Sequence, residues 1–204
     1  MADFTAKDVQ TLRQQAGVGM MDAKKALGET GGDIESAFDL LRERGLAAAA
    51  KRADREASEG AIGSYLHLQD GRPISGVLVE LVSETDFVAK TPEFGDIAKD
   101  IAMHVAWGKP SWTTREDVPA DIVAKEAEMI SKQAENEGKP EHIIPKIVEG
   151  RIESFYKDHV LYDQVFANSA KFEGTIGEMV TQLAARMGEN ISIRRFARLT
   201  IGEE

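Results

Sequence analysis

The apolar residues of this chain change their spacing three times along its length, and these changes restrict the possible folds more than any other feature. Over residues 5–45 they recur every three or four positions, as on one face of a helix. Over residues 61–83 they alternate or run continuously, as in strands. Helical spacing then returns, before a last β-rich stretch, "NISIRRFARLTI". Two adjacent strands, several helices and a final strand predict an α+β fold with a three-stranded antiparallel sheet packed with helices.

The first part of the chain predicts three short helices that form a small bundle. Gly17 ends the first helix, the stretch "TGGD" separates the second from the third, and Asp33 caps the third. Residues 46–58, "LAAAAKRADREAS", contain strong helix formers but little bulky apolar surface, so we expect a helical linker there. The expected domains are therefore a helical domain at 1–45, the linker at 46–58 and a core domain at 59–204.

The core domain is expected to begin with a β-hairpin around the turn residues "DGRP". In its first strand, Ile62, Leu66 and Leu68 point one way, which predicts a half-buried strand. Tyr65 and His67 point the other way. Helical stripes then predict four helices, at about residues 94–108, 119–136, 141–157 and 175–188.

Composition excludes several classes of function. The 204 residues include 35 acidic residues against 25 Lys and Arg, a net charge of −10 that has the wrong sign for direct binding to nucleic acid. Cysteine is absent, which removes disulfides and thiol nucleophiles. The N-terminal residues lack a signal-peptide pattern, and no run approaches about 18 apolar residues. We therefore expect a cytoplasmic protein that does not bind membranes.

Motifs that carry chemistry are missing from the sequence. The glycines of "AGVGMMDAKK" do not form a phosphate-binding loop, because the Lys and Ser/Thr positions of that motif are absent and no strand precedes it. The four histidines show no metal-ligand spacing, and His104 is expected to be structural. The sequence therefore predicts no catalytic site, no metal and no cofactor.

One loop, "SETDFVAKTPEF" at residues 83–94, has two interpretations. In the first, Asp86 caps the following helix and Phe87 folds back into the core. In the second, the turn presents both residues to a partner. Composition alone does not decide between them.

Several motifs together resemble the bacterial elongation factor Ts family, whose members are nucleotide exchange factors for elongation factor Tu. The central one is "TDFVAK" at residues 85–90, and "GVGMMDAKKAL" and "GDIESA" precede it. It is followed, in the order of the family, by "AMHVA", "GKPEHI", "VEGRIESF" and "ENISIRRFA". The resemblance covers essentially the whole chain.

The resemblance implies an N-terminal ubiquitin-associated-like domain and a translation elongation factor that promotes GDP release from elongation factor Tu. Such a factor is not an enzyme, because it acts by binding the nucleotide-free GTPase. A Thr-Asp-Phe-Val loop would press near the magnesium and phosphate site of the GTPase, while the helical domain docks on it. The implied partner-binding residues are Thr85, Asp86, Phe87 and Val88 in the loop, Leu12, Met20, Met21 and Lys24 in the docking segment, and His67 as a weaker core contact.

The chain departs from the family's long members in one respect. Those members carry two copies of the core motifs, whereas this chain fuses both sets into one copy, which implies a homodimer. Two other hypotheses remain: a module that binds ubiquitin-like proteins through its N-terminal domain, and a hydrolase with an unfamiliar site.

Overall fold

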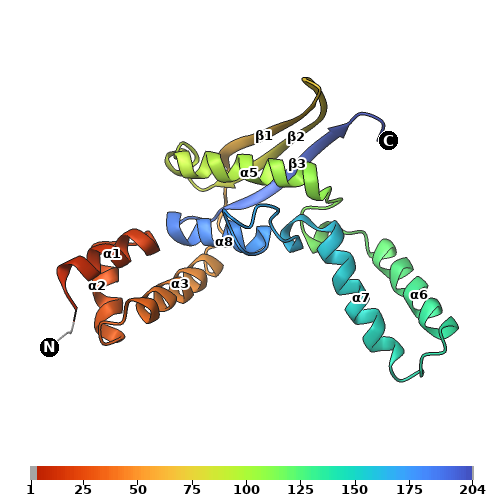
Figure 1. The fold of residues 1–204 in the computed structure, drawn as a ribbon, viewed down its shortest axis with the longest axis horizontal. Helices are drawn as coiled ribbons and strands as arrows, with labels where there is room; N and C mark the ends of the chain where they lie inside the picture. The colour runs from red at the N-terminus through yellow and green to blue at the C-terminus, as the bar shows by residue number, and fades with distance from the viewer. Residues whose placement is uncertain (1–3, 204) are drawn as a thin grey trace. The chain divides into compact units, whose positions relative to one another are not determined.

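The computed structural model describes residues 4–203 and confirms the predicted α+β fold (Figure 1). The described residues form two compact units. The first unit comprises residues 4–60, Val82–Thr91 and Val180–Ser192. The second unit comprises Ala61–Leu81, Pro92–Met179 and residues 193–203.

Three helices open the first unit: α1 (Ala6–Ala16), α2 (Met20–Glu29) and α3 (Ile34–Ala50). Local chemistry sets their ends. Gly17 adopts a left-handed conformation with φ of 65°, and its N–H donates to the Arg13 carbonyl, which ends α1 as predicted. Asp33 accepts a hydrogen bond of 2.6 Å from the Ser36 N–H and so caps α3, also as predicted.

The helical bundle has its own small core. Small side chains on α2 and α3 let the helices approach closely around two fully buried leucines. The buried members are Val9, Leu12, Ala23, Ala26, Leu27, Ala37 and Leu41. The third helix continues through Gly45 to Ala50, so the first residues of the predicted helical linker belong to α3.

A three-stranded sheet organises the second unit, with the strand order β1-β2-β3. A two-residue turn, Asp70-Gly71, joins the first two strands with φ of 51° and 77°, as a tight hairpin turn requires. Between the second and third strands, Ser75 meets Thr200 and Glu80 meets Arg195, which makes this pair antiparallel. The strands are β1 (Glu59–Gln69), β2 (Arg72–Ser83) and β3 (Ser192–Thr200).

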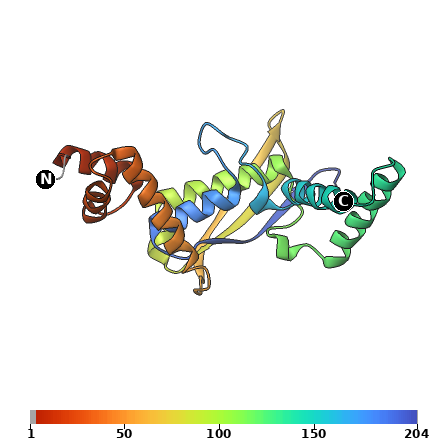
Figure 2. The same ribbon diagram turned by 90° about the horizontal axis from the view of Figure 1, so that it is seen from below.

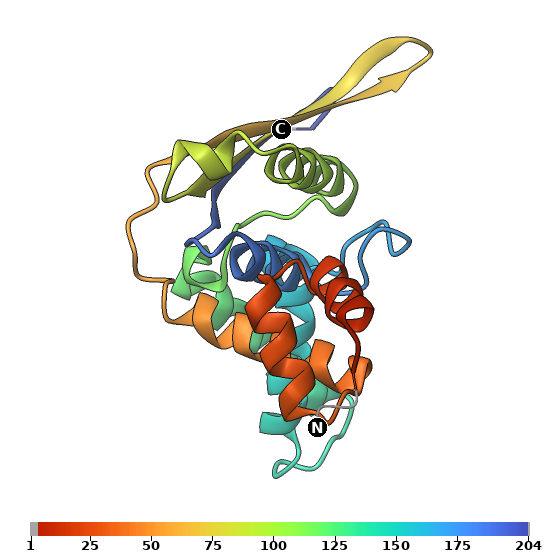
Figure 3. The same ribbon diagram turned by 90° about the vertical axis from the view of Figure 1, so that its left-hand side faces the viewer.

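Helix α5 (Pro92–Gly108) runs along one face of the sheet (Figure 3). The approach is so close that a Cβ at Gly63 would lie 2.1 Å from the Ala98 carbonyl oxygen. Val77, Val79 and Leu81 alternate along β2 as buried residues, as expected for the covered face.

The side chains of β1 alternate as predicted, but the large apolar ones do not lie on the buried face of the strand. Ile62, Leu66 and Leu68 are exposed, whereas Gly63 between them is buried. The physical reason is the close contact with α5. On the face that α5 covers, there is room only for glycine, which has no side chain.

Helices α6 (Ala120–Asn136) and α7 (Ile144–His159) form an antiparallel hairpin, close to the predicted ranges (Figure 2). Arg115 braces α7 near its end, because its guanidinium pairs with Glu153 at 2.9 Å and with Asp163. It also lies 4.6 Å from the centre of the Tyr156 ring. The remaining elements are α4 (Asp86–Ala89), α8 (Ile176–Met187) and the short 3-10 helices η1 (Arg115–Asp117) and η2 (Leu161–Asp163).

His104 lies inside the second unit as a neutral, fully hydrogen-bonded side chain. It is 1% exposed, and its Nε2 lies 3.0 Å from Gln164 Oε1 while its Nδ1 accepts from the Ala167 N–H at 3.2 Å. Gln164 in turn donates to the Gly108 and Asp158 carbonyl oxygens. Burial lowers the pKa of His104, against a smaller opposing effect of the hydrogen bond to Gln164.

We predict that His104 makes the unfolding free energy fall as the solution becomes acidic. Above the ordinary histidine pKa of about 6.5 the ring is neutral in both states. Below it, the unfolded chain binds a proton that the folded protein resists, so stability is lost as pH falls from the ordinary pKa toward the lowered folded pKa, where the loss levels off. Denaturant unfolding at about pH 7.5 and about pH 5.5 measures this loss.

The His104→Gln variant is expected to show a smaller loss between these pH values, whatever its absolute stability. Exposed His142, changed to Gln, serves as the matched control for the substitution itself. Equal pH dependence in the parent and in His104→Gln would contradict the prediction.

Candidate functional site

The loop after β2 turns the chain through a single helical turn, α4. Thr85 stands before it in an extended conformation, with φ of −126° and ψ of 153°, and its hydroxyl oxygen accepts from the Val88 N–H at 3.4 Å. The residue that caps this helix is therefore Thr85. The interpretation in which Asp86 caps the following helix is wrong, because Asp86 already lies within the first turn of α4.

Phe87 protrudes from this turn into solvent. Its side chain is 81% exposed, and α4 contains no buried residue at all. The interpretation in which Phe87 folds back into the core is therefore wrong. A helix of four residues has too little length to bury a face of its own, so the aromatic ring remains available.

Asp86 is paired along the same turn with Lys90, four residues later. The hydrogen bond from Lys90 lowers the pKa of the Asp86 carboxyl, and the same bond raises the pKa of Lys90. Both groups therefore stay charged around neutral pH. The pair holds the Asp86 carboxylate beside α4 and leaves the neighbouring Phe87 ring uncovered.

Glu189, far away in the sequence, fixes the start of this turn. Its two carboxylate oxygens accept from Thr85, one from the backbone N–H at 3.0 Å and one from the hydroxyl at 2.5 Å. Sequence reasoning missed this contact, because the two residues are 104 positions apart. The stretch "ENISIRRFA" drew attention as a family motif, but nothing in its pattern indicates this contact with the loop.

Asn190 adds a second set of contacts at the same place. Its backbone N–H donates to the Glu84 carboxylate at 2.7 Å, and its side-chain amide donates to the Ala53 and Arg55 carbonyl oxygens at 3.0 Å and 2.6 Å. Arg55 also pairs with Glu84. The residues before Thr85 and the chain after α3 are thus both attached to the connection between α8 and β3.

The predicted docking segment lies on α2, where it forms an exposed apolar and basic surface. Met21 is 74% exposed, and Met20 and Lys24 are exposed as well. Leu12 was expected on this surface, but it is 0% exposed and packs in the core of the bundle. Leu12 is buried because its helical spacing from Val9 places both residues on the buried stripe of α1.

His67 lies on β1 in the second unit, and its ring is exposed. Its Nδ1 is 3.3 Å from the Tyr65 hydroxyl, two residues earlier on the same face of the strand. The predicted site residues thus come from four separate elements: the α4 turn, helices α1 and α2, and strand β1.

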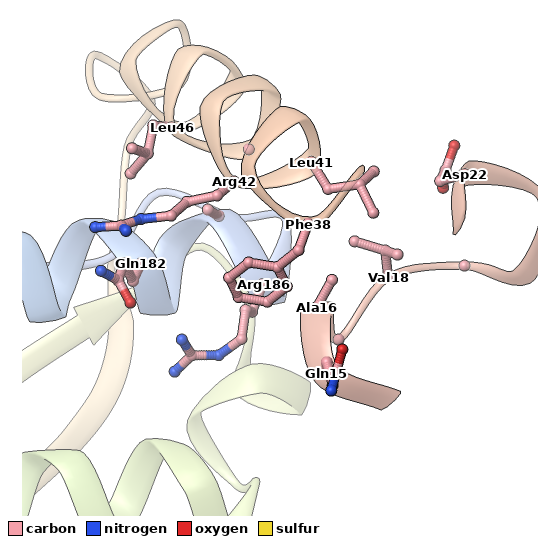
Figure 4. A pocket seen from close by; sticks show the side chains of 14 residues that line it. Gln15, Ala16, Val18, Asp22, Phe38, Leu41, Arg42, Leu46, Gln182 and Arg186 are labelled. Carbon is pink, nitrogen blue, oxygen red and sulfur yellow. The ribbon is translucent and has the colours of Figure 1, made fainter. Parts of the chain in front are cut away.

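A cavity of about 300 Å³ lies within the first unit (Figure 4). Phe38 and Leu41 from α3 and Arg186 from α8 stand around it, together with the turn between α1 and α2. Met20, Met21 and Lys24 do not line it. The cavity borders α2 through Asp22, which lies between Met21 and Lys24 in the sequence.

Metal ligands do not cluster in the part of the chain that the structure describes: residues 4–203 contain no group of three or more His, Asp or Glu side chains suited to a metal ion. Within the same residues, each helix is too short or too polar to cross a membrane.

Comparison with known proteins identifies the family. Residues 47–173 match the family model described as "Elongation factor TS". Elongation factor Ts of Desulforamulus reducens is 50% identical over 203 residues, which cover 100% of this chain and 91% of the relative. Elongation factor Ts of Thermosipho melanesiensis is 48% identical over 200 residues, which cover 98% of this chain and 100% of the relative. This chain therefore belongs to the elongation factor Ts family.

Proposed function

We propose that this protein is a cytoplasmic translation factor that promotes GDP release from a GTPase of the elongation factor Tu type. The Thr85–Val88 turn would press near the magnesium and phosphate site of the GTPase. The observation that carries the proposal is the exposed Phe87 ring at the tip of a capped turn, in a chain of this family. We further propose that it works without chemistry of its own and without direct contact to nucleic acid or membrane.

An exchange factor needs only to bind the nucleotide-free GTPase more tightly than the nucleotide-bound form. Each tenfold acceleration of release requires about 1.4 kcal/mol of differential interaction. Burying one Phe side chain contributes roughly 1.5–3 kcal/mol, which accounts for about one to two factors of ten. Phe87 can therefore drive a large part of one contact but not the whole effect, and other contacts must hold the two proteins together.

The α4 turn is suited to this task because it is ordered before the partner arrives. Thr85 caps it, and the pair of Asp86 with Lys90 spans it from start to end. A side chain already held in its bound position loses less conformational entropy on binding. More of the free energy gained by burying the ring is therefore available to act on the partner.

We predict that Phe87→Ala lowers the saturating rate of stimulated GDP release by about tenfold or more, because the apolar wedge is lost. Its thermal stability should hardly change. Truncating a core Phe costs about 3–5 kcal/mol, but this ring packs against no core. Release of a fluorescent GDP analogue in stopped flow gives the rate, and calorimetry gives the melting temperature.

Trp107→Ala is the matched control, since Trp107 is also a largely exposed aromatic residue. It should leave the release rate close to that of the parent. A Phe87→Ala variant that releases nucleotide at the parent rate would contradict the role of the wedge.

The helical domain at residues 1–45 is proposed to supply the docking affinity, with 46–58 as the linker and 59–204 as the core domain. Support comes from the exposed methionines of α2, since flexible Met side chains adapt well to a partner surface. Lys24 adds a positive charge beside them. His67 is proposed as a further partner contact from β1. Leu12 supports this surface from within the bundle.

We predict that the double variant Met20→Ser, Met21→Ser raises the concentration of factor that gives half-maximal release. The saturating rate should change little, because the α4 turn is intact. Both side chains are exposed, so folding should be unaffected. A variant that binds the GTPase normally but fails to capture a ubiquitin-like protein would favour the ubiquitin-binding hypothesis instead.

The uncovered face of the sheet is proposed to bind a second copy of the chain. Leu66 and Leu78 are exposed on neighbouring strands, and Ile62, Leu68 and Leu199 are exposed as well. Contiguous apolar surface of this kind usually marks an interface. A second copy is the expected occupant because the chain carries one fused copy of the core motifs, and a twofold pairing would rebuild the two-part surface.

We predict that light scattering gives twice the chain mass of 22.3 kDa at micromolar concentrations. Leu66→Lys combined with Leu199→Lys should give the single-chain mass, because buried charges oppose the apolar contact. Met129→Lys on α6 is the control, as Met129 is exposed away from the sheet, and it should remain dimeric. A parent protein of single-chain mass across this range would contradict the dimer.

A further inference from the structure

We infer that Glu189 is a positioning residue, which holds the Asp86–Phe87 turn in the orientation that nucleotide exchange requires. The inference rests on the proposed exchange function and extends it to a residue outside the loop. Glu189 contacts Thr85 and none of its atoms belongs to the exposed tip. It would act on the GTPase through the loop alone.

The position of Glu189 follows from the end of α8. Gly188 takes a left-handed conformation with φ of 72°, and its N–H donates to the Ala184 carbonyl at 2.9 Å. This geometry ends the helix and turns the chain sharply, which favours glycine at this position. The next side chain, Glu189, is thereby directed at the start of the α4 turn.

The chemistry of the Thr85 hydroxyl links Glu189 to the cap of α4. A hydroxyl has one proton to donate and lone pairs to accept with. Because its proton goes to the Glu189 carboxylate at 2.5 Å, an oxygen lone pair is left for the Val88 N–H at 3.4 Å. Glu189 therefore sets the orientation in which Thr85 caps the turn that carries Phe87.

Neighbouring contacts keep Glu189 itself in place. Asn190 donates its backbone N–H to Glu84, the residue just before Thr85. Its side-chain amide holds the Ala53 and Arg55 carbonyls. Ser83 adds a hydrogen bond of 3.0 Å from its hydroxyl to the Thr85 carbonyl. The turn is thus attached on both sides of Thr85. Among these contacts, the hydrogen bonds to carboxylate groups are the strongest.

A held turn matters more for driving release than for docking. Phe87 can displace groups of the partner only if the turn that carries Phe87 itself resists displacement. The docking contacts of α2 do not depend on Glu189. Loss of Glu189 should therefore lower the saturating release rate while the half-saturating concentration of factor stays nearly constant.

The test measures release of a fluorescent GDP analogue from the GTPase with the full-length variants Glu189→Ala and Glu189→Gln. We expect a fall of about tenfold in the saturating rate for Ala and a smaller fall for Gln, whose amide oxygen still accepts one of the two bonds. Glu128→Ala is the matched control, because Glu128 is an exposed carboxylate paired with Lys132 on α6. It should release nucleotide at the parent rate.

A double-variant cycle with Phe87→Ala separates positioning from a general loss of structure. If Glu189 acts through the turn, Glu189→Ala should have little further effect once Phe87 is gone. Equal losses in both backgrounds would overturn the inference, as would parent-like rates for both Glu189 variants. If instead Phe87→Ala alone leaves the rate unchanged, the proposed wedge fails first, so the two failures are distinguishable.

Discussion

The contact between Gly63 and the backbone of Ala98 is the constraint that lets the sheet and α5 pack face to face. A methyl group at position 63 would lie 2.1 Å from the Ala98 carbonyl oxygen, so only glycine lets the sheet approach α5 this closely. Both β2 and α5 then have a buried face, with Leu81 near the end of one and Phe94 near the start of the other. The connection between β2 and α5 contains the single helical turn α4, on which Phe87 is exposed.

Polar contacts then give the exposed turn a fixed conformation. Glu189 and Asn190 fix the residues around Thr85, and Asp86 pairs with Lys90 across α4. This arrangement combines a capped helical turn with an exposed aromatic side chain. It offers a rigid apolar projection, together with a separate exposed surface on α2, which is what a protein needs if it acts by binding one state of a partner more tightly than another.

Much of the fold could be predicted because it follows from local patterns. Helical spacing located α5, α6 and α7. At the start of α8, Thr175 and Glu178 each accept a hydrogen bond from the other's backbone N–H, which is the capping box that their spacing in the sequence indicates. The buried side of β1 was not predictable from hydrophobicity, because close packing selects Gly63 rather than the larger apolar residues Ile62 and Leu66. Leu12 could not be assigned to the core or the surface by resemblance alone. The hydrogen bonds between Glu189 and Thr85 join residues with no shared pattern, so they required the three-dimensional structure.

The central claim is that this protein loosens bound nucleotide on a partner GTPase by contact alone. It is tested most directly by mixing the protein, far below the GTPase concentration, with an elongation factor Tu loaded with a fluorescent GDP analogue and an excess of unlabelled GDP. The account predicts accelerated and complete release, since each molecule of the factor dissociates and serves many GTPase molecules in turn. Release at the spontaneous rate, or a burst limited to the amount of added protein, would contradict it.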